Sequence, residues 1–490
     1  MRRRQRLLES LTRTSTPDDQ MIRWILRITL QTKGRKRSAD ARDTFDLGLL
    51  EDLGVAVPTG KRTRVSVSEL RARCAERLAQ LGQTPAEPCM ATDNARLLSR
   101  VLDLSAAEEA VVAFVIGLDS ESSLRDAWNR LQTRSLQRTI EQLAFILELP
   151  TGRVRSALRS DGPLRSLPLV ELPRADGPLE HDLTLSQTIS SALLRPLSDE
   201  RDLVKRFIAP PTPATLTLAD YPHVRDDVDL LVRFLRAVLA RKAKGVNILI
   251  HGPSGSGKTQ LVSALAAELG AALDVVAFED EDNDVLGGQQ RLERYALCQR
   301  VLRSRKNALV LFDEAEDAFP CGFTSFFARE SGRNKAWTNR LLETNGVPTI
   351  WVSNAIAQID RAFIRRFDFV LKLEHPPRSV RRNILHKHLQ GTKIPEDHLD
   401  ALSEREDLSP GHVERAARFV KLLRTKSEGR ARAELDRVIA ANLGAMGSAR
   451  TSERPKSELR YDRSLLNVSI EPDKLIAGLA RTKSGTACFY

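Results

Sequence analysis

The sequence predicts an α/β protein in which helices cover both faces of a parallel sheet of five strands, with a mostly helical domain before the sheet. Two patterns lead to this fold class. In the second half of the chain, short apolar runs alternate with helical stretches, which is typical of a parallel sheet with crossover helices. In residues 46–209, Leu and Ala recur at helical spacing. The chain has 490 residues, enough for about three domains.

The first 45 residues are basic, with 12 Lys and Arg against 5 Asp and Glu, a net charge of +7. We expect this end to be partly disordered, apart from a short helix near Met21–Leu30. Such a composition is typical of a solvated terminus. It also allows contact with nucleic acid or with an anionic membrane surface.

Residues 139–172 have the outline of a winged helix within the helical domain. A helix is followed by a turn, by a second helix that carries Arg153, Arg155 and Arg159, and by a strand-like run. This pattern is consistent with DNA contact in a major groove, with a winged-helix-like module used for protein contacts, or with an ordinary pair of helices.

A proline-rich boundary precedes the sheet domain, which we expect over residues 210–378. Pro210, Pro211 and Pro213 disfavour helix there. The five predicted strands are Asn247–Ile250, Leu273–Phe278, Ala308–Phe312, Thr349–Val352 and Val370–Leu373. A helical tail over residues 379–443 follows, and the small and polar residues of 444–460 predict a linker.

The first predicted strand leads into a phosphate-binding loop that opens a helix. Its residues are Gly252, Pro253, Ser254, Gly255, Ser256, Gly257, Lys258 and Thr259. Glycines let backbone N–H groups turn inward around phosphates, and the helix N-terminus favours negative charge. We expect Lys258 to reach the β- and γ-phosphates and the Thr259 hydroxyl to bind Mg²⁺.

An apolar strand ending in two acids lies about 50 residues further on, at Asp313 and Glu314. Asp313 is expected to hold Mg²⁺, directly or through water. Glu314 is expected to polarise the attacking water.

A third strand ends in Asn354, and the run Asp360–Asp368 then contains Arg365 and Arg366. The Asn354 amide is a candidate for orienting water near the γ-phosphate. The two arginines either are solvated charge or supply positive charge to a γ-phosphate on a neighbouring subunit.

These motifs together resemble the AAA-type ATPases of the AAA+ superfamily, over residues 220–430. The resemblance implies a P-loop αβα sandwich with a five-stranded parallel sheet and a helical lid at 379–443. It implies ATP and Mg²⁺ as cofactors, a sensor role for Asn354 and an arginine-finger role for Arg365 and Arg366. It also implies a homo-oligomeric ring, usually a hexamer, that remodels a protein partner.

Two positions depart from the family pattern or leave it open. Many members carry an aromatic-hydrophobic-Gly loop after the second strand, whereas this chain has Asp284–Gly288, with no aromatic residue and with acids upstream. This argues against threading of a polypeptide. Arg415 falls where a second sensor would lie, and it either reaches nucleotide or is a surface arginine.

The last residues echo the entry to the sheet domain. Tyr221–Gly245 and Tyr461–Gly485 are identical at eight of 25 positions. We expect residues 461–490 to be the truncated start of a second AAA-type module, as in bacterial proteins with a helical N-terminal region and two modules. The alternative is a complete protein with a chance similarity.

Three functions follow as hypotheses. The first is Mg-dependent ATP hydrolysis coupled to remodelling of a protein partner. The others are an ATP-gated DNA-binding regulator and an inactive truncated remnant. The longest apolar run, Ala110–Leu118, is far shorter than a membrane span, and five cysteines without a CxxC pair fit a reducing compartment. We therefore expect a cytoplasmic protein with no membrane span.

Overall fold

The computed structural model describes residues 17–32, 46–57, 66–85, 87–131, 135–172, 183–280, 282, 284–319 and 331–445. The chain divides into two compact units, residues 1–383 with 409–411 and residues 384–408 with 412–490. Residues 446–490 lie outside the described part. The expected linker, apart from its first two residues, and the expected start of a second module at 461–490 therefore stay predictions.

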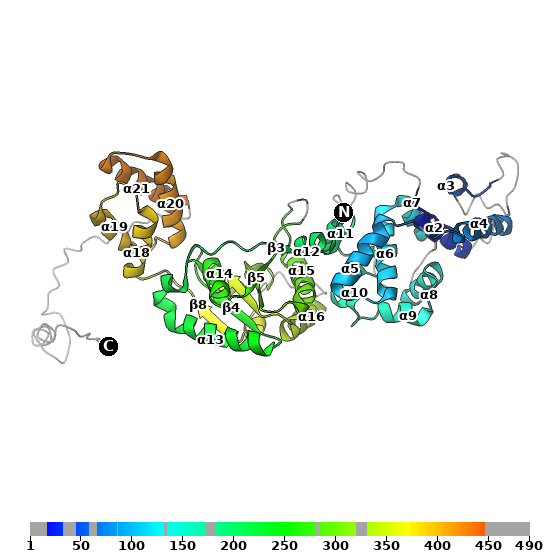
Figure 1. The fold of residues 1–490 in the computed structure, drawn as a ribbon, viewed down its shortest axis with the longest axis horizontal. Helices are drawn as coiled ribbons and strands as arrows, with labels where there is room; N and C mark the ends of the chain where they lie inside the picture. The colour runs from blue at the N-terminus through cyan, green and yellow to red at the C-terminus, as the bar shows by residue number, and fades with distance from the viewer. Residues whose placement is uncertain are drawn as a thin grey trace, which may run out of the picture. The chain divides into compact units, whose positions relative to one another are not determined.

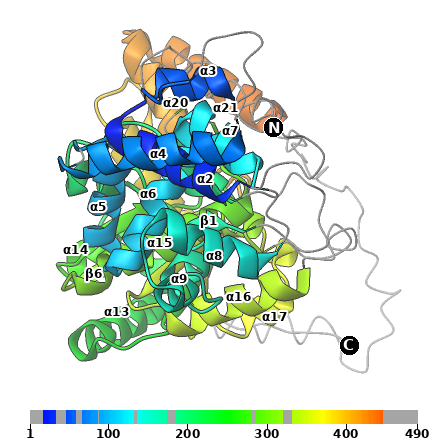
Figure 2. The ribbon, with the colours of Figure 1, turned by 90° about the vertical axis from the view of Figure 1, so that its right-hand side faces the viewer.

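Helices form the first part of the first unit (Figure 1). The short helix expected near Met21–Leu30 is α2, Asp19–Gln31, and its apolar face is buried. It lies alongside α4 (Figure 2), so this helix shares a core with the helices that follow residue 46. The helices are α2, α3 (Leu47–Asp52), α4 (Val67–Gly82), α5 (Met90–Leu102), α6 (Ala106–Ser120), α7 (Ser122–Asn129), α8 (Leu136–Ile146), α9 (Thr151–Ala157), α10 (Pro163–Ser166), α11 (Gln187–Leu193) and α12 (Glu200–Lys205).

The helix α6 is central to this region because most of its side chains are buried. It begins with a capping box in which Ser105 N donates to Glu108 Oε2 at 2.7 Å and Glu108 N donates to Ser105 Oγ at 3.4 Å. The Phe114 ring lies 5.3 Å from Trp24 and 5.4 Å from Trp128, both edge-to-face. These contacts join α2, α6 and α7.

The segment predicted to resemble a winged helix contains α8, α9, α10 and the strand β1, Val170–Glu171. This strand pairs antiparallel with β2, Thr184–Leu185. The elements follow one another as helix, turn, helix and strand, and the assignment as a winged helix stays a prediction.

The sheet has the strand order β3-β5-β6-β7-β4-β8. Pairings among β4 to β8 are all parallel, so the predicted α/β fold with five parallel strands is confirmed. The sheet nevertheless has six strands, because β3 adds antiparallel to the edge of β5. The strands are β3 (Ile208–Ala209), β4 (Asn247–His251), β5 (Ala272–Val276), β6 (Ala308–Phe312), β7 (Thr349–Ser353) and β8 (Phe369–Lys372).

Successive residues of each strand point to opposite faces, and each face belongs to a different core. On β4, Ile248 and Ile250 join the core made with α13 (Arg225–Arg241) and α14 (Lys258–Glu268). Leu249, between them, joins the core made with α15 (Gly288–Val301) and α16 (Ser331–Thr344). This second core is continuous with that of the N-terminal helices.

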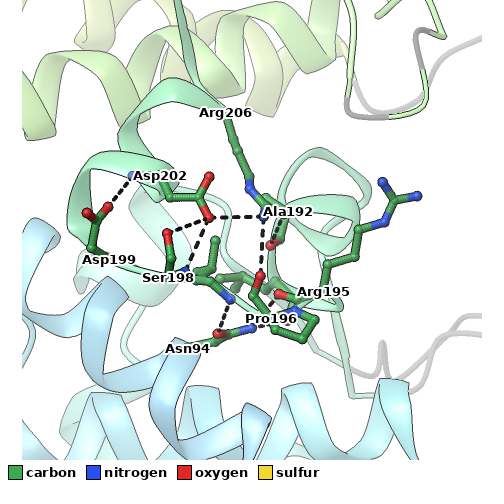
Figure 3. A network of polar contacts seen from close by, with 10 residues as sticks. Asn94, Ala192, Arg195, Pro196, Ser198, Asp199, Asp202 and Arg206 are labelled. Atoms are coloured by element: carbon green, nitrogen blue, oxygen red, sulfur yellow. Dashed lines mark hydrogen bonds and ion pairs between the residues drawn. The ribbon is translucent and has the colours of Figure 1, made fainter.

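A polar network fixes the segment between the N-terminal helices and β3 (Figure 3). The buried Asn94 of α5 donates to the carbonyls of Leu193 and Arg195 at 2.9 and 2.8 Å. Arg206 donates to the Ala192 carbonyl at 2.9 Å and lies 3.4 Å from Asp202. The segment between α11 and β3 is therefore fixed by hydrogen bonds from Asn94 and Arg206 before the chain enters the sheet.

The second unit is a separate helical bundle. It contains half of α18 (Arg378–Leu389) and most of α20 (Pro410–Leu423), with all of α19 (Glu396–Ser403) and α21 (Glu428–Ala445). Its own core includes Leu385, Leu399, Val413 and Ile439. No helix in the described residues is long and apolar enough to cross a membrane.

Candidate active site

The phosphate loop joins β4 to α14, as the sequence predicts. Gly252, Gly255 and Gly257 have φ angles of 157°, 75° and 94°, which side chains rarely adopt. A Cβ on Gly252 would lie 2.0 Å from the Leu373 carbonyl oxygen. Glycine is therefore required where the loop passes the end of β8.

Lys258 is buried at the start of α14 and points into the loop. Its Nζ donates to the carbonyls of Gly252 and Pro253 at 2.9 and 2.8 Å. Burial lowers the pKa of Lys258, and the charges of Asp313 and Glu316 oppose that shift.

The phosphate loop also contains a polar group, the Ser256 hydroxyl, that a bound phosphate could satisfy. The Oγ of the buried Ser256 has no hydrogen-bond partner among the described residues, and a buried unpaired hydroxyl is costly unless a ligand completes it. This hydroxyl, the Lys258 ammonium and the α14 N-terminus all favour an anion. The exposed Ser254 completes the turn.

The two predicted metal ligands lie together. The Thr259 hydroxyl donates to Asp313 Oδ2 at 2.7 Å, although 54 residues separate them in the sequence. The other carboxylate oxygen, Oδ1, accepts from Glu314 N at 2.9 Å. A hydroxyl and a carboxylate are hard oxygen donors of the kind that Mg²⁺ prefers, so this pair fits the expected ion.

Glu314 follows β6 with its side chain exposed and with φ and ψ of 51°. The protein around the carboxyl group removes part of its hydration and raises the pKa of Glu314, and the charge of Asp313 adds to the rise. Arg291 opposes it.

Asn354 lies at the end of β7, one strand away from the acids on β6. Its backbone N–H donates to both carboxylate oxygens of Glu316, at 3.2 and 3.3 Å. Glu316 thereby ties the end of β7 to the turn that follows Glu314.

Arg365 and Arg366 differ in how they are held. Arg366 forms an ion pair with Glu343 at 3.2 Å and donates to the Ala362 carbonyl at 2.5 Å. Arg365 is exposed, and within the described part of the chain no hydrogen bond or ion pair engages its side chain. Neither arginine is among the charges that shift the pKa of Lys258 or Glu314.

The other candidate residues lie away from the phosphate loop or in the second unit. On and beyond α9, Arg153 is exposed, Arg155 donates to Gln137 at 3.0 Å, and Arg159 forms a bidentate ion pair with Asp161. DNA contact by these arginines stays a prediction. Arg415 is exposed on α20 in the second unit, and its two alternative roles stay predictions.

Three residues of the site are absent from the sequence prediction. Tyr221 is buried and donates from its hydroxyl to the Gly257 carbonyl at 2.9 Å, which braces the phosphate loop. Glu316 holds the end of β7, and Arg291 contacts the backbone of both acids on β6. The acid-rich run after Asp313 was a signal for Glu316. The other two depend on packing between distant segments.

Comparison with known proteins agrees with this geometry. Residues 248–375 match the model of the ATPase family associated with various cellular activities (AAA). Proteasome-activating nucleotidase 2 of Halobacterium salinarum is 26% identical over 285 residues, covering 54% of this chain and 68% of that protein. Proteasome-activating nucleotidase 2 of Haloferax volcanii is 27% identical over 169 residues, covering 33% and 40%. Vacuolar protein sorting-associated protein 4 of Dictyostelium discoideum is 23% identical over 177 residues, covering 35% and 39%.

The sheet and its phosphate loop define a nucleotide-binding domain of the α/β class. Over residues 248–375 this domain is similar to the ATPase domain of the AAA family. The chain spans about two fifths of the length of the Haloferax and Dictyostelium proteins.

Proposed function

We propose that this chain hydrolyses ATP with Mg²⁺ and uses the turnover to remodel a protein partner. The observation that carries the proposal is the 2.7 Å hydrogen bond from Thr259 to Asp313, which joins the phosphate loop to the acidic strand end. Such a pair is needed for a metal ion to sit against a bound triphosphate.

Each residue of the site has a distinct task in this proposal. Lys258 and the loop amides bind the phosphates, and Thr259 and Asp313 hold Mg²⁺, which neutralises phosphate charge when it is bound. Glu314 orients water and accepts its proton. Asn354 directs its amide toward the same water.

The proposed assembly is a homo-oligomeric ring in which Arg365 acts on the nucleotide of a neighbouring subunit. Its exposed side chain supports this role. Arg366 is tied to Glu343 within its own subunit, so we assign it to positioning that segment. Relatives named for proteasome activation and vacuolar protein sorting support a protein as the partner.

The test uses the full chain with two variants. Lys258→Ala is expected to lose nucleotide binding, whereas Glu314→Gln is expected to bind ATP without hydrolysing it. Native mass spectrometry of Glu314→Gln with ATP should show a ring, and the specific activity of the wild type should rise with protein concentration. A wild type without ATPase activity, or turnover retained in Glu314→Gln, would contradict the assignment.

A further inference from the structure

An arginine lies buried directly behind the two acids on β6. Arg291, in the first turn of α15, is 2% exposed. Its guanidinium carbon lies 4.1 Å from the centre of the Phe278 ring and 4.4 Å from that of Phe312. The two rings fix the position of the guanidinium group, because a flat cation packs well against aromatic faces.

The edge of the same guanidinium group faces the peptide backbone of the acids. Its Nη2 donates to the Asp313 carbonyl, and its Nη1 donates to the Glu314 carbonyl at 3.3 Å. Nε is buried without a partner, and among the residues that the structure describes no carboxylate is within ion-pair distance of Arg291. Burial lowers the pKa of Arg291, and the nearby charges of Glu314, Asp317, Asp313 and Glu316 oppose that shift. A buried arginine normally pairs with a carboxylate, so its two bonds to consecutive carbonyls suggest a task at this peptide.

The backbone at Glu314 requires such support. Its φ of 51° is in the left-handed region, which is unfavourable for a residue with a side chain. A 3-10 turn, Ala315–Asp317, starts directly after it. Because the backbone angles set the direction of the side chain, whatever holds this peptide also aims the Glu314 carboxylate.

The start of α15 is held against the same turn. A Cβ on Gly288, the first residue of α15, would lie 2.0 Å from the Asp317 carbonyl oxygen. The helix therefore approaches the turn as closely as a glycine allows. Arg291, three residues later in the same turn, reaches the acids from a position that this contact fixes.

We propose that Arg291 is a positioning residue for hydrolysis, which holds the Asp313–Glu314 peptide so that the Glu314 carboxylate faces the attacking water. The proposal rests on the proposed function, in which Glu314 activates that water. We expect Arg291 to act on turnover and not on nucleotide binding, because it donates to the carbonyls of Asp313 and Glu314, directly after β6, and not to the phosphate loop.

The experiment compares two buried arginines of one helix in the full chain. Arg291→Met and Arg291→Lys test the proposal. Arg294→Met is the matched control, because Arg294 is also buried on α15 but donates to the carbonyls of Arg206 and Glu279. The measurements are kcat and KM for ATP, ADP affinity by calorimetry, and the melting temperature.

We expect Arg291→Met to lower kcat by about ten-fold or more, the effect of losing charge-assisted hydrogen bonds near the reacting groups. KM and ADP affinity should stay within about two-fold of wild type, as expected when only the transition state is affected. The kcat of Arg291→Lys should lie between those of wild type and Arg291→Met, because lysine keeps the charge but not the planar pair of donors. Arg294→Met should keep wild-type kcat.

Three results would overturn the proposal. One is an unchanged kcat in Arg291→Met, another is an equal loss in Arg294→Met, and the third is a loss of ADP affinity that parallels the loss of kcat. If Arg291→Met does not fold, wild-type kcat in Arg291→Lys overturns it. An inactive wild type would instead contradict the proposed function itself, so the two failures are distinguishable.

Discussion

Gly288 lies against the turn that follows Asp313 and Glu314, so adding a single methyl group at this position should impair both ATP hydrolysis and stability. In Gly288→Ala, the new Cβ would lie 2.0 Å from the Asp317 carbonyl oxygen, 2.5 Å from its carbonyl carbon and 3.0 Å from Ala318 Cα. Ordinary contacts of a Cβ begin at 3.4 Å. All three obstructing atoms are backbone, so no side chain can move aside. The start of α15 must therefore withdraw from the turn by more than 1 Å. Overpacking of this kind lowers the free energy of unfolding by about 1–3 kcal/mol.

That withdrawal has two measurable consequences. The 3.3 Å bond from Arg291 to the Glu314 carbonyl would exceed hydrogen-bonding distance. Since a bond from a charged donor contributes about 1.5–3 kcal/mol, kcat should fall by about ten- to hundred-fold. The melting temperature should fall by about 2–12 °C, because each kcal/mol shifts it by about 2–4 °C in a domain of this size.

The adjacent glycine provides the control. Gly287 has φ −69° and ψ 159°, which alanine adopts readily, and the nearest atom to its added Cβ is Gln290 Oε1 at 3.8 Å. Gly287→Ala should therefore keep wild-type kcat and melting temperature. Steady-state ATP hydrolysis and thermal melting of both variants decide the matter. If Gly288→Ala behaves like Gly287→Ala, the reasoning about α15 is wrong.

Three further predictions concern the metal pair, the two arginines and the junction with the N-terminal helices. Thr259→Val should raise the Mg²⁺ concentration needed for half-maximal hydrolysis by about ten-fold or more, because it removes one oxygen ligand. Thr259→Ser keeps the hydroxyl and should keep the wild-type dependence of hydrolysis on Mg²⁺ concentration. In the proposed ring, Arg365 of one subunit acts at the nucleotide site of the next. Arg365→Ala should therefore abolish hydrolysis, and mixing it with Lys258→Ala should restore some activity. Arg366→Ala should retain more turnover than Arg365→Ala and melt at a lower temperature. Glu293 of α15 accepts a hydrogen bond from the Thr188 hydroxyl of α11. Burial raises the pKa of Glu293, so its stabilising contribution is present at acidic pH and is lost as pH rises through the folded-state pKa. Glu293→Gln should therefore melt at a higher temperature than wild type at pH 8 and at the same temperature at pH 4. If the difference in melting temperature between variant and wild type were equal at both pH values, the expected pKa rise of Glu293 would be contradicted.

The parallel strands could be predicted because each is a buried apolar run between helices. β6, Ala308–Phe312, has the predicted bounds, and the other four differ from prediction by a few residues at their ends. β3 escaped prediction for a physical reason: it has two residues, followed directly by prolines. Its strand character comes from pairing Ile208 with Val276 on β5, which no local pattern reveals.

In the candidate site, too, residues with a local sequence motif could be predicted, whereas residues brought in by the packing of distant segments could not. The phosphate loop is recognisable because its glycines, its lysine and its threonine are consecutive. Arg291 and Tyr221 are not recognisable, because their roles exist only once α15 packs behind β6 and the segment before α13 packs against Gly257. In the sequence, Arg291 is one of several arginines on a helix of mixed composition.

In the proposed function, the helix that binds the phosphates and the helix that holds the acids pack on different faces of the sheet. The helix that begins with Lys258 packs in the core of one face, together with α13. The helix that carries Arg291 packs in the core of the other face, which is continuous with the N-terminal helices through α5 and α11. On this second side, Arg300 of α15 donates to the Leu102 carbonyl at the end of α5, at 2.9 Å. One helix, α15, therefore contacts both the end of α5, through Arg300, and the backbone of Asp313 and Glu314, through Arg291. This arrangement explains why we expect changes on the α15 side to alter kcat while nucleotide affinity stays constant.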